Sequence, residues 1–262
     1  MADIKVVVHG ALGKMGQEVL NTVFKTDGMA PFGAADIAAT EGLTSLPNGS
    51  GEIPISGDVS KAVRGADVVV DFTNAEGARK VIAAASKNGV NCVIGSTGLL
   101  SDDFETAKRV AAESNISIII APNFAMGGVL MTYLVKSAAK FFDYADLMEV
   151  HHEAKIDAPS GTALALAKMI AEDKEFNRHE PEKETLPGTR GGNYRGISIH
   201  STRMPGHLAH HQVIFGALGQ TLTLRHDSIS RESFMPAVML AAKEVTKRRI
   251  FEVGLEGVLG LS

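Results

Sequence analysis

The chain has 262 residues, 45% of them hydrophobic and 21% charged, which suits one large domain or two smaller ones. Its net charge of -4 gives no bulk reason to expect nucleic acid or an anionic membrane as a partner. No apolar run approaches the roughly 20 residues that span a bilayer, and no basic segment with a cleavage site opens the sequence. The single cysteine, Cys92, excludes an intramolecular disulfide and a cysteine-rich metal site. We therefore expect a cytoplasmic protein.

The first 120 residues alternate short apolar runs with longer amphipathic segments. The apolar runs are continuous rather than alternating, which is typical of strands covered on both faces. Their alternation with helices predicts an α/β domain with a Rossmann-like, doubly wound parallel sheet. The predicted strands cover residues 4–10, 31–36, 67–73, 91–97 and 116–123, and the predicted helices cover residues 14–25, 76–87 and 102–114.

This rhythm changes after Pro122, and the later elements predict a second, α+β domain. A polar segment rich in glycine and proline, residues 174–196, predicts a long loop, and such loops are usually functional or interaction arms. Short turns separate the strands that follow it, which favours a mixed sheet with antiparallel pairs. The predicted helices cover residues 127–142, 162–172 and 232–247, and the predicted strands cover residues 145–152, 196–203, 211–217 and 220–228.

A glycine-rich turn follows the first predicted strand. Gly10, Gly13 and Gly16 have the spacing G-x-x-G-x-x-G between a strand and a helix. Such a turn lets the backbone approach a pyrophosphate, which the amino end of the helix then binds. The pattern alone is weak, because glycines also occur in plain turns. Here Asp36 lies 20 residues after Gly16, where a carboxylate accepts hydrogen bonds from the adenosine ribose, so we predict a dinucleotide site.

Asp36 bears on the choice between NADH and NADPH. A carboxylate there suits the free 2′-hydroxyl of NAD, and no arginine follows it to bind a 2′-phosphate. Lys14 could still meet a 2′-phosphate, or it could be a solvated lysine of the first helical turn. The sequence leans slightly towards NADH.

Three further loops follow strands of the same predicted sheet, where ligands bind in open α/β sheets. These are residues 71–76, 95–98 and 121–124, and each could also be a plain turn. The predicted cofactor-binding residues are Gly10, Ala11, Gly13, Lys14, Met15, Gly16, Asp36, Gly95, Ser96, Thr97, Ala121, Pro122, Asn123 and Phe124.

Residues 149–166, EVHHEAKIDAPSGTALAL, concentrate groups that carry protons. His151 and His152 end a predicted strand, so their side chains should point to opposite faces. That makes it improbable that both bind one metal ion, and we predict no metal site. A third ligand would have to come from a distant histidine. The distant candidates are His200, His207, His210, His211 and His226.

The same stretch then offers a site for an anion. Ser160 suits the N-cap of a helix that begins with Gly161 and Thr162. Free N–H groups at the helix start could hold a carboxylate, with Lys155 as a nearby cation. The alternative is a capped helix after a polar loop. The dinucleotide site upstream favours the catalytic interpretation, in which the imidazoles transfer protons.

The segment HHEAKIDAPSGTA closely resembles the signature E-x-H-H-x-x-K-x-D-A-P-S-G-T-A of the 4-hydroxy-tetrahydrodipicolinate (dihydrodipicolinate) reductase family, with Glu149 in the leading position. The resemblance extends over essentially the whole chain, through GALGKMG, GSTG, APNF and HQVIFG. It implies that His151 and Lys155 form the catalytic, proton-donating pair. It also implies that the substrate is bound by His152, Gly161, Thr162 and Arg231.

The resemblance further implies the organisation of the molecule. Residues 1–122 and 233–262 would form the dinucleotide-binding domain, and residues 123–232 the substrate-binding and oligomerisation domain of a homotetramer. His9 is a departure, because a small residue is expected just before the glycine turn, and it could crowd that turn.

The predicted activity is reduction of 4-hydroxy-tetrahydrodipicolinate to tetrahydrodipicolinate by NADH or NADPH, in the diaminopimelate route to lysine. The expected partner is thus a small dicarboxylate substrate. Two alternatives remain open from the sequence: another two-domain NAD(P) oxidoreductase that acts on an amino-acid-derived substrate, and a dinucleotide sensor without catalysis.

Overall fold

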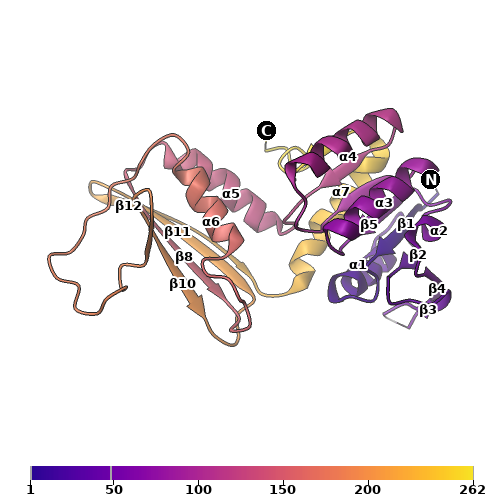
Figure 1. The fold of residues 1–262 in the computed structure, drawn as a ribbon, viewed down its shortest axis with the longest axis horizontal. Helices are drawn as coiled ribbons and strands as arrows, with labels where there is room; N and C mark the ends of the chain where they lie inside the picture. Colours follow the sequence, from indigo (N-terminus) through magenta and orange to yellow (C-terminus); the bar gives the residue numbers. More distant parts are fainter. Residues whose placement is uncertain (1, 48, 262) are drawn as a thin grey trace. The chain divides into compact units, whose positions relative to one another are not determined.

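The computed structural model describes residues 2–47 and 49–261. The chain forms two compact units (Figure 1). The first contains the residues up to Met126 together with those from Arg231 onwards, and the second is Gly127–Ser230. The chain passes from one unit to the other after Met126 and again after Ser230. Both points lie close to the domain boundaries predicted after residues 122 and 232. The roles predicted for the two units stay predictions at this point.

The first unit is built on an eight-stranded sheet with the order β13-β7-β6-β5-β1-β2-β4-β3. All neighbours pair in parallel except β3 and β4. The chain runs outwards from β1 in both directions, so a switch point lies between β1 and β5, where open α/β sheets bind ligands. The strands are β1 (Ile4–His9), β2 (Met29–Ala35), β3 (Gly42–Ser45), β4 (Glu52–Ser56), β5 (Val68–Asp71), β6 (Asn91–Ile94), β7 (Ile118–Ile120) and β13 (Phe251–Val253).

Helices cover both faces of this sheet. Val7 of β1 and Val69 of β5 are fully buried in one cluster with apolar residues of α3 and α4. Val6 and Val8 are buried as well, and alternation along the strand points them to the opposite face. This explains the continuous valine runs. The helices of the unit are α1 (Lys14–Lys25), α2 (Val59–Ala62), α3 (Ala75–Asn88), α4 (Ser101–Glu113) and α7 (Met235–Lys247).

The second unit is a five-stranded mixed sheet with the order β12-β11-β8-β10-β9. Only the β8–β10 pair is parallel, and the other pairs are antiparallel. The predicted mixed sheet is therefore confirmed. Its elements are α5 (Met126–Ala139), β8 (Tyr144–His151), α6 (Gly161–Ile170), β9 (Gly192–Tyr194), β10 (Ile197–Arg203), β11 (Ala209–Ala217) and β12 (Gln220–Ser228).

The core of this unit lies between the sheet and the pair α5 and α6, which pack on one face (Figure 1). Ala145 and Leu147 of β8 point into it and are buried. Because strand residues alternate, Glu149 and His151 continue the same buried row, whereas Met148, between Leu147 and Glu149, is 43% exposed. A carboxylate and an imidazole thus extend an otherwise apolar row.

The sequence missed several short elements. The strands β3, β4 and β13 and the helix α2 were not predicted, and β9 lies inside the segment predicted as a loop. Each has three to five residues, which is too short for a hydrophobic period to be recognised. The predicted helix at residues 232–247 begins with a 3-10 turn, η1 (Arg231–Phe234), before α7.

Candidate active site

The glycine turn after β1 brings three backbone segments into close contact. Gly10 has a φ of +83°, and a Cβ there would lie 2.8 Å from the Phe72 carbonyl oxygen. A Cβ on Gly16 would lie 2.1 Å from the Gly10 carbonyl oxygen. Both positions therefore require glycine. Gly13 is the N-cap of α1, so the free N–H groups of that helix are presented at the turn.

Asp36 lies beside this turn in a cavity of about 980 Å³ that Gly10 and Gly13 also line. Its two carboxylate oxygens accept hydrogen bonds from the N–H groups of Leu12 and Ala38, each at 3.0 Å. The carboxylate is thereby held at the end of β2, next to the glycine turn. This is the arrangement that binds an adenosine ribose in dinucleotide sites.

The remaining cofactor candidates divide into two groups. Ala11 is buried in the turn, and Lys14 and Met15 begin α1. The other group follows two adjacent strands, since Gly95–Thr97 come after β6 and Ala121–Phe124 come after β7.

The aromatic ring of Phe72 joins these later loops to the loop after β5. A Cβ on Gly95 would lie 2.2 Å from the Phe72 ring. The same ring packs edge-on against Phe124, with 5.6 Å between centroids. The three loops predicted at the carboxyl edge of the sheet therefore lie together.

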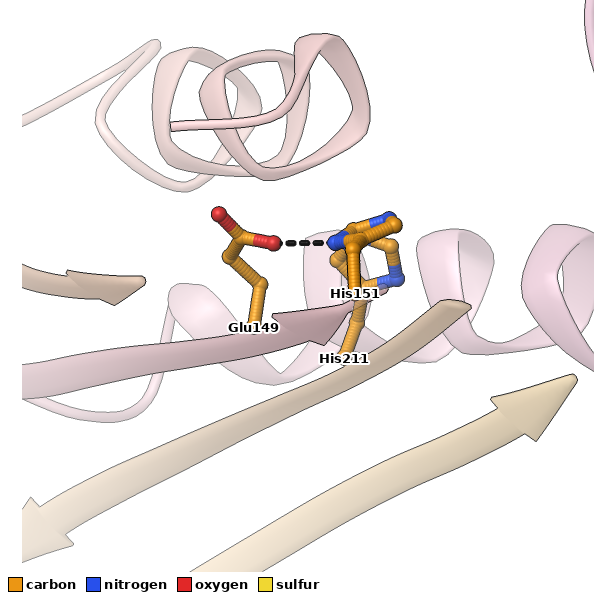
Figure 2. Close-up of side chains that lie close together, drawn as sticks. All are labelled: Glu149, His151 and His211. Atoms are coloured by element: carbon orange, nitrogen blue, oxygen red, sulfur yellow. Dashed lines mark hydrogen bonds and ion pairs between the residues drawn. The ribbon is translucent and has the colours of Figure 1, made fainter. Parts of the chain in front are cut away.

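In the second unit, three polar side chains gather on the helix-covered face of the sheet (Figure 2). Glu149 and His151 come from β8, and His211 comes from β11, where it is the register partner of Glu149. Ser160 joins them as the N-cap of α6, as predicted: its Oγ accepts from the Ala163 N–H. Strand alternation, cross-strand register and a helix cap thus bring four polar residues to one place.

Glu149 is the centre of this group. It has no exposed surface, and its oxygens accept hydrogen bonds from the Arg203 guanidinium at 2.8 and 3.0 Å and from the Ser160 N–H at 3.3 Å. Burial acts to raise the pKa of Glu149, but hydrogen bonds from Arg203, Ser201 and His151 outweigh it, so the pKa lies below its ordinary value. Glu149 is therefore a buried but ionised carboxylate.

His151 is held by Glu149 through its Nδ1 (Figure 2). A carboxylate only accepts hydrogen bonds, so Nδ1 carries the hydrogen and Nε2 is left for another partner. Burial lowers the pKa of His151, and Glu149 offsets this only in part, because the cations Lys155 and Arg203 act in the opposite direction. Once protonated, such an imidazole is a stronger acid than a solvated one.

His211 supports His151 from the side. The two rings pack edge to face with centroids 5.3 Å apart. Burial, and secondarily His151, lowers the pKa of His211 to about 4, so it is neutral near pH 7. Its Nε2 lies 3.2 Å from Ser160 Oγ. That hydroxyl accepts from the Ala163 N–H and has both a hydrogen and a second lone pair left, so the tautomer of His211 decides which of the two groups donates.

Glu149, His151 and His211 could also be considered as metal ligands, because their ligand atoms lie within 4.8 Å of one another. His151 and His152 do not share a site, since β8 ends at His151 and His152 is exposed beyond it. Arg203 takes both oxygens of Glu149 and would repel a cation placed there. The geometry therefore favours proton transfer, and the absence of a metal stays a prediction.

The loop after β8 carries the other predicted residues. Lys155 Nζ lies 2.7 Å from the Asp157 carboxylate. The backbone N–H of Lys155 donates to the His152 carbonyl oxygen. Arg203 also donates to the Asp157 carbonyl oxygen at 2.7 Å, which ties this loop to Glu149. Lys155 is thus fixed close to His151, on whose pKa it acts.

Gly161 and Thr162 form the first turn of α6 and are exposed. A Cβ on Gly161 would meet nothing within 4 Å, so packing does not require glycine there. The bare helix start leaves room for an anionic group to approach the N–H groups.

Sequence reasoning missed Arg203, and it predicted Arg231, which belongs to the other unit. Arg203 ends β10, and its register partner is His151. An arginine ending a strand gave no signal until that pairing was known. Arg231 begins η1 in the first unit and is exposed, and its contact with substrate stays a prediction.

Both units match models of one protein family. Residues 4–124 match the model described as dihydrodipicolinate reductase, N-terminus, and residues 127–259 match dihydrodipicolinate reductase, C-terminus. The chain belongs to the dihydrodipicolinate reductase family. The resemblance of residues 149–163 to the reductase signature is therefore confirmed at the level of the family.

Full-length relatives support this membership. The chain is 46% identical to the 4-hydroxy-tetrahydrodipicolinate reductase of Dehalococcoides mccartyi over 100% of both chains. It is 42% identical to the enzyme of the same name from Geobacillus kaustophilus, over 98% of this chain and 99% of the relative. Dihydrodipicolinate reductases are nicotinamide-dependent oxidoreductases, and the dinucleotide site predicted from the glycine turn agrees with that chemistry.

Solved structures of other proteins have the same fold as this chain. The dipicolinate-bound dihydrodipicolinate reductase from Paenisporosarcina sp. TG-14 has a TM-score of 0.86 at 37% identity, covering 97% of this chain and 99% of that one. An amine dehydrogenase from Mycobacterium smegmatis, at 13% identity and a TM-score of 0.65, shares only the fold, over 95% of this chain and 94% of that one. Within the part of the chain described here, no helix is both long and apolar enough to cross a membrane.

Proposed function

We propose that this protein is a 4-hydroxy-tetrahydrodipicolinate reductase that acts in the diaminopimelate route to lysine. The relatives that match its full length carry that name. The structural observation that carries the proposal is the buried Glu149–His151 pair with Arg203, placed beside the bare start of α6. That combination offers a proton donor next to a place for a carboxylate.

The substrate would be oriented by the loop after β8. Gly161 and Thr162 offer N–H groups and a hydroxyl for one of its carboxylates, and His152 would add a further contact. The relative from Paenisporosarcina was solved with dipicolinate, a planar dicarboxylate. Fixing such a ring at one carboxylate limits its rotation, and such orientation is a large part of catalysis.

Proton delivery falls to His151 and Lys155. A bound dinucleotide would supply hydride to the conjugated cyclic imine formed when the 4-hydroxy substrate loses water. The carbon left nucleophilic by that addition must take a proton. The protonated His151 can donate it from Nε2 and returns to the neutral ring, because Glu149 holds the hydrogen on Nδ1. Lys155, held by Asp157 close by, can return a proton to the imidazole or donate directly. The product is tetrahydrodipicolinate.

NADH is the proposed preferred cofactor, by a small margin. The Asp36 carboxylate is fixed by two N–H groups in the cavity and would repel a 2′-phosphate. Three cations, Arg64, Lys80 and Lys87, also line that cavity and lessen the repulsion, so NADPH should be accepted too. Comparing kcat/KM for the two cofactors tests this, and an NADPH preference would contradict it.

Two further properties belong to the same proposal. A homotetramer formed through the second sheet would cover its outer face, where Tyr144 is 49% and Met148 43% exposed. Sedimentation of the purified protein tests this, and a monomer would contradict it. A cytoplasmic location is supported by the free, buried thiol of Cys92, which suits a reducing compartment.

The reaction itself is tested with substrate freshly made from pyruvate and aspartate semialdehyde. Oxidation of NADH that depends on this substrate is the expected result. NADH binding without oxidation would point to the sensor alternative. Oxidation that required a different amino-acid-derived substrate would point to the other oxidoreductase. Either result would overturn the proposed function.

A further inference from the structure

The first unit contains a second buried histidine–carboxylate pair, which the proposed reaction does not use. His9 ends β1, Asp71 ends β5, and the two are register partners. Asp71 has no exposed surface and His9 is 8% exposed. His9 Nδ1 lies 2.7 Å from Asp71 Oδ1. The ring nitrogen is poorly aligned for a hydrogen bond, so the two groups are in close contact without a well-formed hydrogen bond between them.

The structure explains how a histidine fits at this position. Its ring reaches the first turn of α3, where a Cβ on Gly77 would lie 3.3 Å from His9 Cε1. The same Cβ would lie 2.1 Å from Thr73 Oγ1, so Gly77 leaves space for the Thr73 side chain as well as for the imidazole.

Asp71 connects His9 to two other loops. Thr73 Oγ1 donates to Asp71 Oδ1 at 2.7 Å, and Ser96 Oγ donates to Oδ2 at 2.5 Å. Ser96 Oγ also accepts from the Thr73 N–H at 2.7 Å. The network therefore joins the ends of β1, β5 and β6, each of which leads into a predicted cofactor loop. Among the residues that the structure describes, no lysine or arginine forms an ion pair with Asp71, so His9 is its basic partner.

His9 is also the member of this pair that faces the cofactor cavity. It lines the cavity together with Gly10, Gly13 and Thr73, while Asp71 is sealed beneath the surface. A buried carboxylate next to the glycine turn would repel the diphosphate of a dinucleotide, because charges interact strongly where water is excluded. A basic ring between the cavity and the carboxylate reduces that repulsion.

We propose that His9 is a positioning residue of the dinucleotide site. It reduces the repulsion between the Asp71 carboxylate and the cofactor diphosphate. Through its contact with Asp71, it also holds the loops after β5 and β6 in place. The proposal rests on the dinucleotide site proposed above, but not on the identity of the substrate. The diphosphate is common to NADH and NADPH, so His9 should affect the binding of both by the same factor.

The test is a double-mutant cycle on NADH affinity, measured by nicotinamide fluorescence, with the variants H9A, D71N and H9A/D71N. In H9A the carboxylate is uncompensated, so NADH should bind about 10-fold more weakly, the usual scale for a lost charged contact. In H9A/D71N the carboxylate is gone, so affinity should recover to within about threefold of D71N alone. The substitution H179A removes an exposed histidine of the second unit and should leave affinity unchanged.

Turnover separates this role from a merely structural one. In H9A, kcat at saturating NADH should stay near wild type while KM for NADH rises. The variant H9Q, which keeps polarity and much of the volume, covers the case in which H9A does not fold, and it should show the same loss. Unchanged NADH affinity in H9A and H9Q would overturn the proposal. The proposal would also be overturned if the loss of NADH binding free energy in H9A/D71N equalled the sum of the losses in the two single variants. Wild-type protein that binds NADH without turning over the substrate would refute the proposed reaction and leave this test intact.

Discussion

Each unit buries a histidine beside a carboxylate. Glu149 and His151 share the end of β8, whereas His9 and Asp71 end the neighbouring strands β1 and β5, and different groups surround the two carboxylates. Glu149 is held by the Arg203 guanidinium through two hydrogen bonds. Asp71 is held by two hydroxyls, and its basic partner is His9. Both carboxylates have no exposed surface, so the difference lies in which basic side chain stands against each of them.

This difference separates a reacting histidine from a positioning one. Because Arg203 already balances Glu149, His151 is not needed as a cation, and burial lowers its pKa. Its Nε2 can therefore gain and lose a proton during turnover. His9 is the basic side chain in contact with Asp71, so the role proposed for it is to stay in place rather than to react. In our proposals the same two residue types thus serve chemistry in one unit and cofactor binding in the other.

The largest expected effect is on turnover, from His151→Gln. Loss of a general acid typically costs 10²- to 10⁴-fold, so kcat should fall by roughly that factor, while NADH affinity should change less than about twofold. His152→Gln is the matched control: it should raise KM for the substrate with a smaller effect on kcat. Turnover of H151Q near wild type would remove His151 from the catalytic pair.

Stability should respond next, to Arg203→Gln. This leaves the Glu149 carboxylate buried without its guanidinium, and breaking a buried pair costs roughly 3–5 kcal/mol in free energy of unfolding. The control is Arg109→Gln, which breaks an exposed pair with Glu113 on α4 and should cost less than about 1 kcal/mol. Urea unfolding of both variants measures the difference. Equal midpoints would show that Arg203 does not balance Glu149.

The pH dependence of stability sharpens the comparison further, through His211. Its pKa is about 4 in the folded protein against 6.5 ordinarily, so between these values the unfolded chain binds more protons. Stability should therefore be highest above pH 6.5 and decrease as pH falls towards 4, by roughly 2–4 kcal/mol. His211→Asn should remove most of this decrease in urea unfolding measured near both pH values, whereas His179→Asn should not. An unchanged slope in H211N would contradict the assignment.

The smallest expected effect tests the other pair. Ser96→Ala removes the hydroxyl that donates to Asp71 and accepts from the Thr73 N–H. NADH should bind roughly 3- to 10-fold more weakly, with kcat at saturating cofactor unchanged. Ser101→Ala, at the exposed start of α4, is the control and should bind NADH normally. A loss in kcat instead would mean that the two pairs do not have separate roles.

Much of the fold could be predicted because its signals are local. The valine runs of β1 and β5 and the glycine turn before α1 have periods and spacings that can be recognised in the sequence. The elements that were missed are of two kinds. Strands such as β13 are too short to show a period. The β3–β4 pair extends the sheet by one antiparallel strand, and Pro54 lies within β4, where proline weakens a strand prediction.

The sequence by itself predicted which residues would carry the chemistry: the resemblance to the family implies His151 and Lys155, and helix capping indicates the start of α6. The tertiary structure decided how those residues are tuned. Arg203 and His211 come from strands β10 and β11, more than 50 residues after Glu149, and reach it only through the register of the mixed sheet. Likewise, the pairing of β1 with β5 puts His9 against Asp71. Cross-strand register is set by packing of the whole sheet. No local sequence pattern could therefore predict the contacts of Arg203 and His211 with the Glu149 group, or the contact of His9 with Asp71.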